Sequence, residues 1–596
     1  MTAIEHPAHL SLDSQHASRP NILLVVCVAI GAWLVLVPVA ALLATAFTED
    51  TGLGFGAFTL ENFAEAYSST HILRLIGNSL IYAVGTAVVT FLIGGFVAWA
   101  VERTDAPGAA LFHNLALLSF AIPGLLMAMA WIFVLSPNIG WANALLKSAL
   151  HLKNAPLSIY TMAGMIWALS SHYFPLAYLA IGPALRALDV RMEEAGLMSG
   201  GRYWHVLPKI TLPLLRPAIL SGLLLLFIMG LSSYEVPRLI GRSARIDVFT
   251  TEIQGATTAA PPEFGVASAL SLTLLVTCIV AVYFYRRATR NAEAFATITG
   301  KGYKPTRIEL GRWRWPIAGA IGVIFLIALG LPLFTLAWQS FFRNLSQPFI
   351  GAAVPATLEN YRFILRYPVF LDAVRTSVVV SALAASFVVA LTLVMAWLAR
   401  RSHSRFSWLL DALASAPIAI PSVIVGASIL FTYLIVPIPI YNTIWILFVA
   451  YVTLCLPYGM RFASSGITQI HRELEEAAHV SGATLGQIFR RVLFPLVLPF
   501  LLAAWIYVFV LSVRELGASV FLVGPGTNVL GTISLTMWEE GGSYGAVSAL
   551  GVIQILPLVM IVAALRWLEL RVRRRSEAGP DGAKAVAGPP KAAAAT

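Results

Sequence analysis

The chain has 596 residues, of which 58% are hydrophobic and 12% are charged. A soluble domain carries about 25% charged residues, so this composition excludes an ordinary soluble protein and indicates a polytopic membrane protein. The net charge of +11 does not indicate a nucleic-acid partner, because the basic residues cluster beside apolar runs, where they set membrane topology.

Twelve apolar runs follow one another along the chain, each long enough to cross about 30 Å of hydrocarbon as a helix. The first is expected to be an uncleaved span. It is too long for the apolar core of a signal peptide, although Ala44-Thr45-Ala46 resembles a cleavage site. Cys27, Cys278 and Cys455 lie inside such runs and are expected to be small core residues. The spans are predicted near residues 22–47, 76–100, 112–135, 158–183, 212–233, 266–285, 315–340, 375–399, 407–434, 440–462, 495–513 and 546–566.

Basic residues predict the orientation of these spans. With twelve spans, the basic segment 286–314, the sequence RRSHSR at 400–405 and the arginines after the last span fall on one side, together with both termini. By the positive-inside rule that side is cytoplasmic. Residues 1–21 are therefore expected to form a cytoplasmic tail, the segment 286–314 a basic cytoplasmic linker, and residues 576–596 a disordered cytoplasmic tail.

The two halves of the chain are related in sequence. Residues 59–63, TLENF, return as TLENY at 357–361, an offset of 298 (357 − 59). The offset is 282 (457 − 175) at the prolines of the fourth and tenth spans, and 280 (545 − 265) just before the last span of each half. The order of the matches never breaks, as expected of a duplicated unit. The extra residues of the first half are expected in the loop that holds residues 141–156.

Each repeat contains six spans, so both copies enter the membrane in the same direction. The predicted fold is an all-α polytopic membrane protein with two parallel six-helix repeats, at residues 22–285 and 315–575. Parallel repeats are related by a pseudo-twofold axis along the membrane normal, and a transport pathway is expected between them.

A polar segment interrupts each repeat at the same point. Residues 193–213 read EEAGLMSGGRYWHVLPKITLP, and residues 475–495 read EEAAHVSGATLGQIFRRVLFP. In the second copy the residue types predict a helix over 472–480, a stop at Gly482 and a second helix over 484–493 with one apolar face. Each copy should form a bent helical element that lies against the membrane with one face left free.

These two segments resemble the EAA loop of the permease subunits of binding-protein-dependent ABC importers. The resemblance implies the type I importer permease fold, with each loop acting as a coupling helix that docks into a groove on an ATPase subunit. The structural alternative is a pair of ordinary amphipathic interfacial loops. One residue departs from the pattern, a glycine in place of the second alanine of the first copy, which lowers local helix stability by up to ~1 kcal/mol. The residues that carry the resemblance are Glu194, Ala195, Gly196 and Gly200 in the first copy and Glu476, Ala477, Ala478 and Gly482 in the second.

No motif for binding a nucleotide or a metal is found in the sequence. Gly300-Lys301 lacks the upstream glycine and the following Ser or Thr of a phosphate-binding loop. The chain is therefore expected to bind no cofactor and not to be an enzyme. The resemblance implies two copies of a separate ABC ATPase, which holds ATP and Mg, a periplasmic substrate-binding protein, and a place in the bacterial inner membrane.

Two acidic residues are candidates for the transport path. Glu235 follows the fifth span and Glu515 the eleventh, each just after a Leu-Ser pair, at an offset of 280 (515 − 235). Carboxylates that face each other across the pseudo-twofold axis would suit a ferric cation, and a charge near the membrane core is often functional. The other reading leaves them solvated at the outer helix ends, where Arg514 neutralises Glu515.

The cargo is predicted from weaker features than the coupling loops. Residues 232–237, SSYEVP, and 247–253, DVFTTEI, resemble the region after the EAA loop in ferric iron importers. The resemblance implies ferric iron, moved by ATP-driven alternating access. The same machinery for thiamine, a phosphonate or a polyamine is the alternative. An ion-coupled secondary transporter is more remote, because it predicts charged residues deep within the spans.

Overall fold

The computed structural model describes residues 22–50, 55–68, 70–187, 190–200, 203–290, 308–346, 348, 355–402 and 404–577. The predicted tail at 1–21, most of the predicted linker 286–314 and most of the predicted tail at 576–596 lie outside the described residues.

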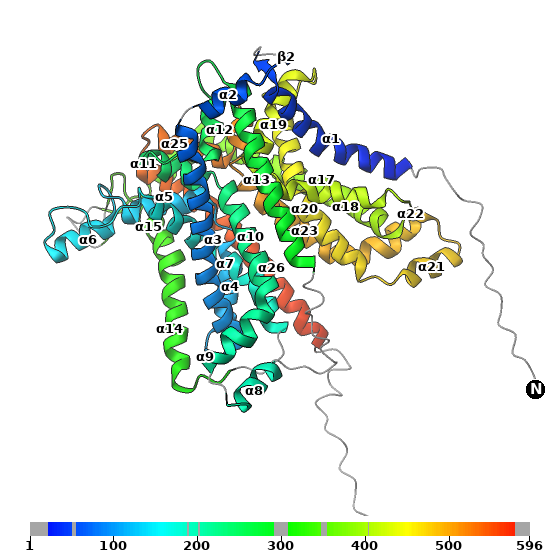
Figure 1. Cartoon of the computed structure of the whole chain (residues 1–596), viewed down its shortest axis with the longest axis horizontal. Helices are drawn as coiled ribbons and strands as arrows, with labels where there is room; N and C mark the ends of the chain where they lie inside the picture. Colours follow the sequence, from blue (N-terminus) through cyan, green and yellow to red (C-terminus); the bar gives the residue numbers. More distant parts are fainter. Residues whose placement is uncertain are drawn as a thin grey trace, which may run out of the picture.

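The described part of the chain is almost entirely helical (Figure 1). The elements of the first half are α1 (Ile22–Ala46), β1 (Thr48–Asp50), β2 (Phe55–Phe58), α2 (Glu61–Ser68), α3 (His71–Arg103), α4 (Ala109–Ser119), α5 (Gly124–Leu135), α6 (Trp141–Leu150), α7 (Met162–Ala187), α8 (Val190–Met198), α9 (Tyr203–Val206), η1 (Leu207–Thr211), α10 (Leu212–Ser232), η2 (Pro237–Gly241), α11 (Arg242–Ala244), α12 (Phe249–Thr257) and α13 (Phe264–Arg290). The elements of the second half are η4 (Gly311–Trp313), α14 (Arg314–Phe325), η5 (Leu326–Gly330), α15 (Leu331–Ser340), α16 (Glu359–Arg366), α17 (Pro368–Arg401), α18 (Ser407–Ser415), η6 (Ala416–Ala419), α19 (Ser422–Ile435), α20 (Ile444–Thr468), α21 (Arg472–Val480), α22 (Leu485–Ile488), η7 (Phe489–Leu493), α23 (Phe494–Val513), α24 (Ser519–Leu522), α25 (Leu530–Glu539) and α26 (Tyr544–Glu577).

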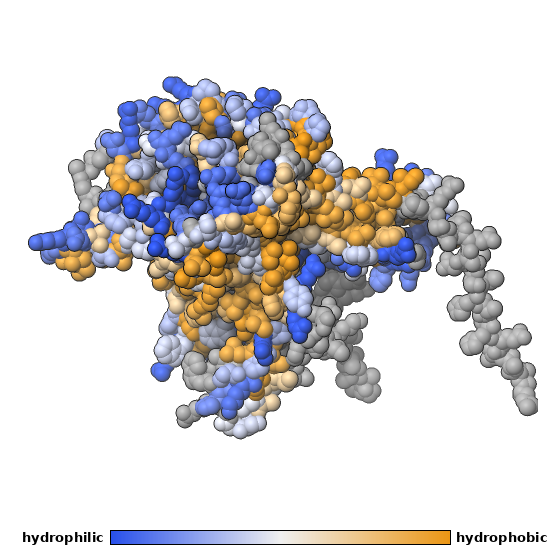
Figure 2. Space-filling model, turned by 45° about the horizontal axis from the view of Figure 1, so that its top comes forward, coloured by the Kyte–Doolittle hydropathy of each residue, from blue (hydrophilic) through white to orange (hydrophobic). Residues whose placement is uncertain are grey.

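Nine helices in the described ranges are long and apolar enough to cross a membrane, and two bent helix pairs raise that number to eleven. The predicted fourth span forms α7, which carries Ser170, Ser171 and His172 near its centre and is not among the eleven. With α7 included and each bent pair counted as one span, the described helices reach the predicted twelve. In Figure 2 hydrophobic residues cover the middle of the visible face, between hydrophilic residues at its top and bottom.

The third and ninth spans are not the continuous helices that the sequence predicted. The axes of α4 and α5 differ by 106°, and those of the helices before and after Pro421 differ by 109°. Pro123 and Pro421 each precede the second leg, and proline has no N–H with which to continue a helix. The second legs reach into the opposite halves, because α5 packs against α15 and α19 packs against α1, α12 and α13.

The first helix of each half also lies against the other half. α1 packs on α17, α18, α19 and α20, while α14 packs on α3 and α4, as Figure 1 shows. Trp33 on α1 donates from Nε1 to the Tyr433 hydroxyl at 3.1 Å, and the Thr453 hydroxyl donates to the Leu34 carbonyl at 3.3 Å. The halves are therefore interlocked rather than placed side by side.

The repeated Thr-Leu-Glu-Asn motif has the same structural role in both halves. Asn62 donates through Nδ2 to three carbonyl oxygens at and just after the end of α1, at 2.8–3.3 Å. Asn360 donates to two carbonyl oxygens at the end of α15, both at 2.9 Å. A Cβ on Gly265 would lie 2.1 Å from Asn62, and one on Gly545 would lie 2.4 Å from Asn360. The motif thus joins the first and last helices of each repeat.

Two further sequence expectations can be compared with the fold. All three cysteines are buried and free, as expected. Helix α6 lies in the segment of the first half where extra residues were expected, whereas residues 436–443 between α19 and α20, all described, contain no helix.

Candidate functional site: coupling segments and central cavity

Residues 193–213 and 475–495 are called the coupling segments here. The second has the predicted bent shape: α21 ends before Gly482, and α22 and η7 follow. Gly482 has φ +84°, a left-handed conformation in which residues with a Cβ are strained, and Gly200 in the first segment also has φ +84°. Ile488 is buried on the apolar face. The local sequence therefore fixes the bend at the same place in both copies.

We expect Gly482→Ala to weaken the bend, because an L-residue in the left-handed region costs about 1–2 kcal/mol. ATP-driven uptake should fall while the amount of protein in the membrane stays unchanged, as measured with radiolabelled cargo and by quantitative immunoblot. Gly486→Ala is the matched control, since Gly486 lies in the same segment at negative φ with open space around it. Equal uptake by the two variants would contradict a role for the bend.

The predicted coupling residues are largely exposed. Ala195, Glu476 and Ala477 are exposed and Ala478 is half-buried. Glu194 lies on α8, and its side chain is outside the described part of the structure. Gly196, the departure from the pattern, has a packing reason: a Cβ there would lie 2.7 Å from Ile210 Cδ1. The glycine lets α8 approach η1 closely.

Each coupling segment is tied to a long helix by an ion pair that the sequence predictions did not include. Arg103, at the end of α3, pairs with Glu193, and both side chains are buried. Arg401, at the end of α17, donates from Nε to Glu475 Oε1 at 2.8 Å. The arginines lie 298 residues apart (401 − 103) and the glutamates 282 (475 − 193), so the two ion pairs are equivalent in the repeat. These two contacts are called the anchor pairs.

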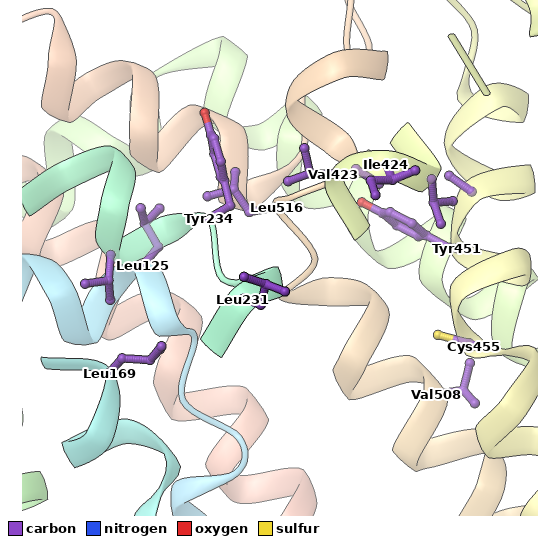
Figure 3. Packing of buried hydrophobic residues seen from close by; sticks show 14 of the residues in the cluster. Leu125, Leu169, Leu231, Tyr234, Val423, Ile424, Tyr451, Cys455, Val508 and Leu516 are labelled. Carbon is purple, nitrogen blue, oxygen red and sulfur yellow. The ribbon is translucent and has the colours of Figure 1, made fainter. Parts of the chain in front are cut away.

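A cavity of about 580 Å³ lies between the two halves. The first half contributes Phe120, the middle of α7 and the last two turns of α10, and the second half contributes residues at the start of α19 and along α20 and α23. Both predicted path residues, Glu235 and Glu515, line it. Figure 3 shows buried residues of both halves nearby, with Leu231 of α10 between Leu169 of α7 and Tyr451 of α20.

Glu515 lies beyond the last residue of α23 and is held in the cavity wall. Its Oε1 accepts the N–H of Ala518 at 3.0 Å, and Ser422, the first residue of α19, also donates to it. Burial raises the pKa of this carboxyl, and the negative charge of Glu235 adds to the rise, whereas the N–H of Ala518 opposes it. The Glu515 carboxyl thus already accepts hydrogen bonds from protein donors.

Glu235 occupies the equivalent place in the first half. A Cβ on Gly124, the first residue of α5, would lie 3.8 Å from Glu235 Cδ and 3.6 Å from His172 Nε2. Each carboxyl therefore lies beside the first turn of a bent pair's second leg, where unpaired N–H groups and the helix dipole favour negative charge. Both glutamates are half-buried and line the cavity wall.

Arg514 does not pair with Glu515 among the ion pairs of the described residues. Its guanidinium instead donates to the carbonyl oxygen of Phe120 in the opposite half and lies over the Phe120 ring, 5.0 Å from the centroid. The Phe120 ring in turn stacks on Tyr507 at 5.2 Å. Arg514 therefore joins the halves beside the cavity through a carbonyl oxygen and an aromatic ring, and not through an ion pair with a carboxylate.

The comparison with known families decides the class of the protein. The model of the family described as "Binding-protein-dependent transport system inner membrane component" matches residues 90–292 and 388–574. The chain belongs to this family of ABC importer permeases. Each matched segment contains one coupling segment and one of the two cavity glutamates.

Relatives of this permease have names that indicate different cargoes. The ferric transport system permease protein FbpB of Actinobacillus pleuropneumoniae is 25% identical over 522 residues, covering 86% of this chain and 73% of the relative. The putrescine permease PotI of Escherichia coli K12 is 30% identical over 215 residues, covering 35% of this chain and 75% of the relative. A putative 2-aminoethylphosphonate permease, PhnV of Salmonella paratyphi A, is 29% identical over 248 residues, covering 41% and 91%.

A crystal structure of a bacterial ABC transporter that imports alginate aligns with a TM-score of 0.35 and 19% identity. It covers 42% of this permease and 93% of the other chain.

Another contact of this permease joins its halves, between Arg238, just after α10, and Glu539, the last residue of α25. Arg238 of the first half forms a two-armed ion pair with Glu539 of the second, at 2.6 Å from Nε and 2.9 Å from the second nitrogen, and also donates to Gln254 at 2.9 Å. This contact is called the inter-half ion pair. Arg238 follows α10 at the end away from its coupling segment. In Figure 1 the coupling segments, at α8–α9 and at α21–α22, lie well apart. The halves are thus joined by an ion pair at this end, and the two coupling segments lie apart at the other.

Proposed function

We propose that this permease moves ferric iron from a periplasmic binding protein to the cytoplasm of a bacterium by ATP-driven alternating access. The observation that carries the cargo is the pair Glu235 and Glu515, one from each half, in the wall of a single cavity. Carboxylate oxygens are hard ligands that suit a hard cation. The ferric permease relatives, which align with most of the chain, support the same cargo.

The energy comes from outside the chain in this proposal. Two copies of an ATPase subunit, which bind ATP and Mg, dock on the two coupling segments. The positive-inside rule places those segments and both termini in the cytoplasm. When ATP draws the ATPase copies together, the anchor pairs transmit the movement to α3 and α17. The halves then close at the coupling end, and the inter-half ion pair opens to expose the cavity to the binding protein.

A small organic solute is the second candidate for the cargo. The cavity volume of about 580 Å³ is in the range of sites for small molecules, roughly 300–1,000 Å³. The putrescine and 2-aminoethylphosphonate permeases among the relatives favour this candidate.

Removing both cavity carboxylates should impair uptake of a cation. For the double variant Glu235→Gln/Glu515→Gln we expect uptake of radioactive iron into proteoliposomes, with ATPase and binding protein present, to fall about tenfold or more. A loss of about 1.4 kcal/mol of binding free energy already lowers the affinity tenfold. Glu359→Gln is the matched control, because Glu359 is exposed and, within the described residues, its side chain pairs with Arg343 at the surface. Wild-type uptake by the double variant would contradict the proposed path.

A further inference from the structure

The charges that line the cavity balance one another. Glu235 and Glu515 contribute two negative charges, and Arg461 and Arg514 contribute two positive ones. A path for a bare metal cation or a polyamine needs only the negative charges, and arginines there would repel such a cargo. Both arginines come from the second half. Their counterparts in the first half are neutral, Leu179 (461 − 282) and Tyr234 (514 − 280). The arginines are therefore not required by the shared scaffold.

Arg461 is placed on the face of α20 that lines the cavity. Tyr458 and Ser465, three residues before it and four after it, also line the cavity, as expected for neighbours on one helix face. Its side chain is exposed, and the described residues supply it with no hydrogen-bond acceptor or carboxylate. An arginine in a membrane-spanning helix is costly and as a rule marks the path of a substrate or ion.

The surroundings of the two carboxyl groups differ from those of Arg461. Glu515 accepts hydrogen bonds from Ala518 and Ser422, and both glutamates lie beside helix N-termini, which favour negative charge. Arg514 is directed at a neutral carbonyl. Among the described residues, Arg461 therefore has no acceptor for its positive charge, and the Glu235 carboxylate has no side-chain hydrogen bond or ion pair. The cavity thus offers a cargo an unpaired group of each sign.

We infer that the cargo crosses the cavity as a species that carries an oxyanion group beside a cationic centre, with Arg461 and Arg514 holding the oxyanion. This inference rests on the proposed function and narrows its substrate class. For iron, it means a ferric ion still coordinated by phosphate or by a carboxylate chelator. The same chemistry describes an aminoalkylphosphonate. It excludes a polyamine, which has no oxyanion.

The first test measures binding to the purified permease–ATPase complex without nucleotide. Inorganic phosphate, ferric citrate, 2-aminoethylphosphonate and putrescine are titrated calorimetrically into the wild type and into Arg461→Leu, which installs the residue of the first half. We expect one or more of the three oxyanion probes to bind to the wild type. The affinity should fall about tenfold or more in Arg461→Leu, as for the loss of one charge-assisted hydrogen bond, and should fall by a smaller factor in Arg461→Lys. Arg375→Leu, an exposed arginine of α17 outside the cavity, should bind as the wild type does. Unchanged binding in Arg461→Leu, or binding of putrescine alone, overturns the inference.

The second test separates this inference from the proposed function. Proteoliposomes that contain the complete system receive radioactive iron with a second label on its phosphate or citrate. Entry of both labels together supports both proposals. Entry of iron without the second label overturns the inference and leaves ferric transport standing. Uptake of labelled 2-aminoethylphosphonate without iron supports the inference and refutes ferric transport, and uptake of putrescine alone refutes both.

Discussion

Bridging positions 238 and 539 with a short bismaleimide should stop uptake. These positions lie on opposite halves, and their side chains form the inter-half ion pair. If alternating access opens the cavity away from the coupling segments, this contact must separate in every cycle. The double variant Arg238→Cys/Glu539→Cys is made in a chain whose buried native cysteines are replaced by alanine. Uptake is measured before and after the reagent is added.

Two controls limit how this result is interpreted. Each single cysteine variant should keep its uptake after the reagent, because no bridge can form. The exchanged pair Arg238→Glu/Glu539→Arg should recover more uptake than either single charge reversal, because opposite charges again face each other. Full uptake by the bridged protein would show that the halves do not part at this contact.

Arg103→Leu should destabilise the protein by about 3–5 kcal/mol, because it leaves the buried Glu193 as an unpaired charge. Arg401→Leu should cost less, because the side chains of Arg401 and Glu475 are 19% and 13% exposed, against 3% and 6% for Arg103 and Glu193. Unfolding of the detergent-solubilised protein measures the difference.

A double variant provides the control for this second prediction. Arg103→Leu/Glu193→Leu should regain most of the lost stability, since neither charge is then left alone in the protein interior. It should still transport poorly, because the first coupling segment loses its connection to α3. Equal destabilisation by Arg103→Leu and Arg401→Leu would mean that burial does not set the strength of the anchor pairs.

Much of this architecture was predictable because it depends on local patterns. Apolar runs gave the spans, and the repeat was visible in short matches such as TLENF and TLENY. The bend of the second coupling segment followed from one glycine, Gly482, between two helix-forming stretches. The family was predictable for the same reason, since the EAA pattern is contiguous in sequence.

The features that the sequence did not predict depend on contacts between distant segments. The breaks before Pro123 and Pro421 had a signal, an Ile-Pro pair repeated in both halves, but a proline within an apolar run does not reveal a change in direction of more than 100°. The anchor pairs also had a signal, because opposite charges recur at equivalent positions of the repeat. The charge that Arg461 brings to the cavity had none, since only the packing of the halves shows which face of α20 lines the space between them.

The exchange of first helices between the halves affects how the chain is made. Trp33 and its partner Tyr433 are 400 residues apart. At ~5–20 residues per second, roughly 20 to 80 s of synthesis separate them. During that time the second half offers α1 no protein surface to pack against. Lipid covers that face of α1 instead, which is possible because the face is apolar. Helix α14, in contrast, emerges when α3 and α4 already exist. Until the second half is made, α1 therefore depends on the bilayer and on α13 of its own half, and its packing is completed only late in synthesis.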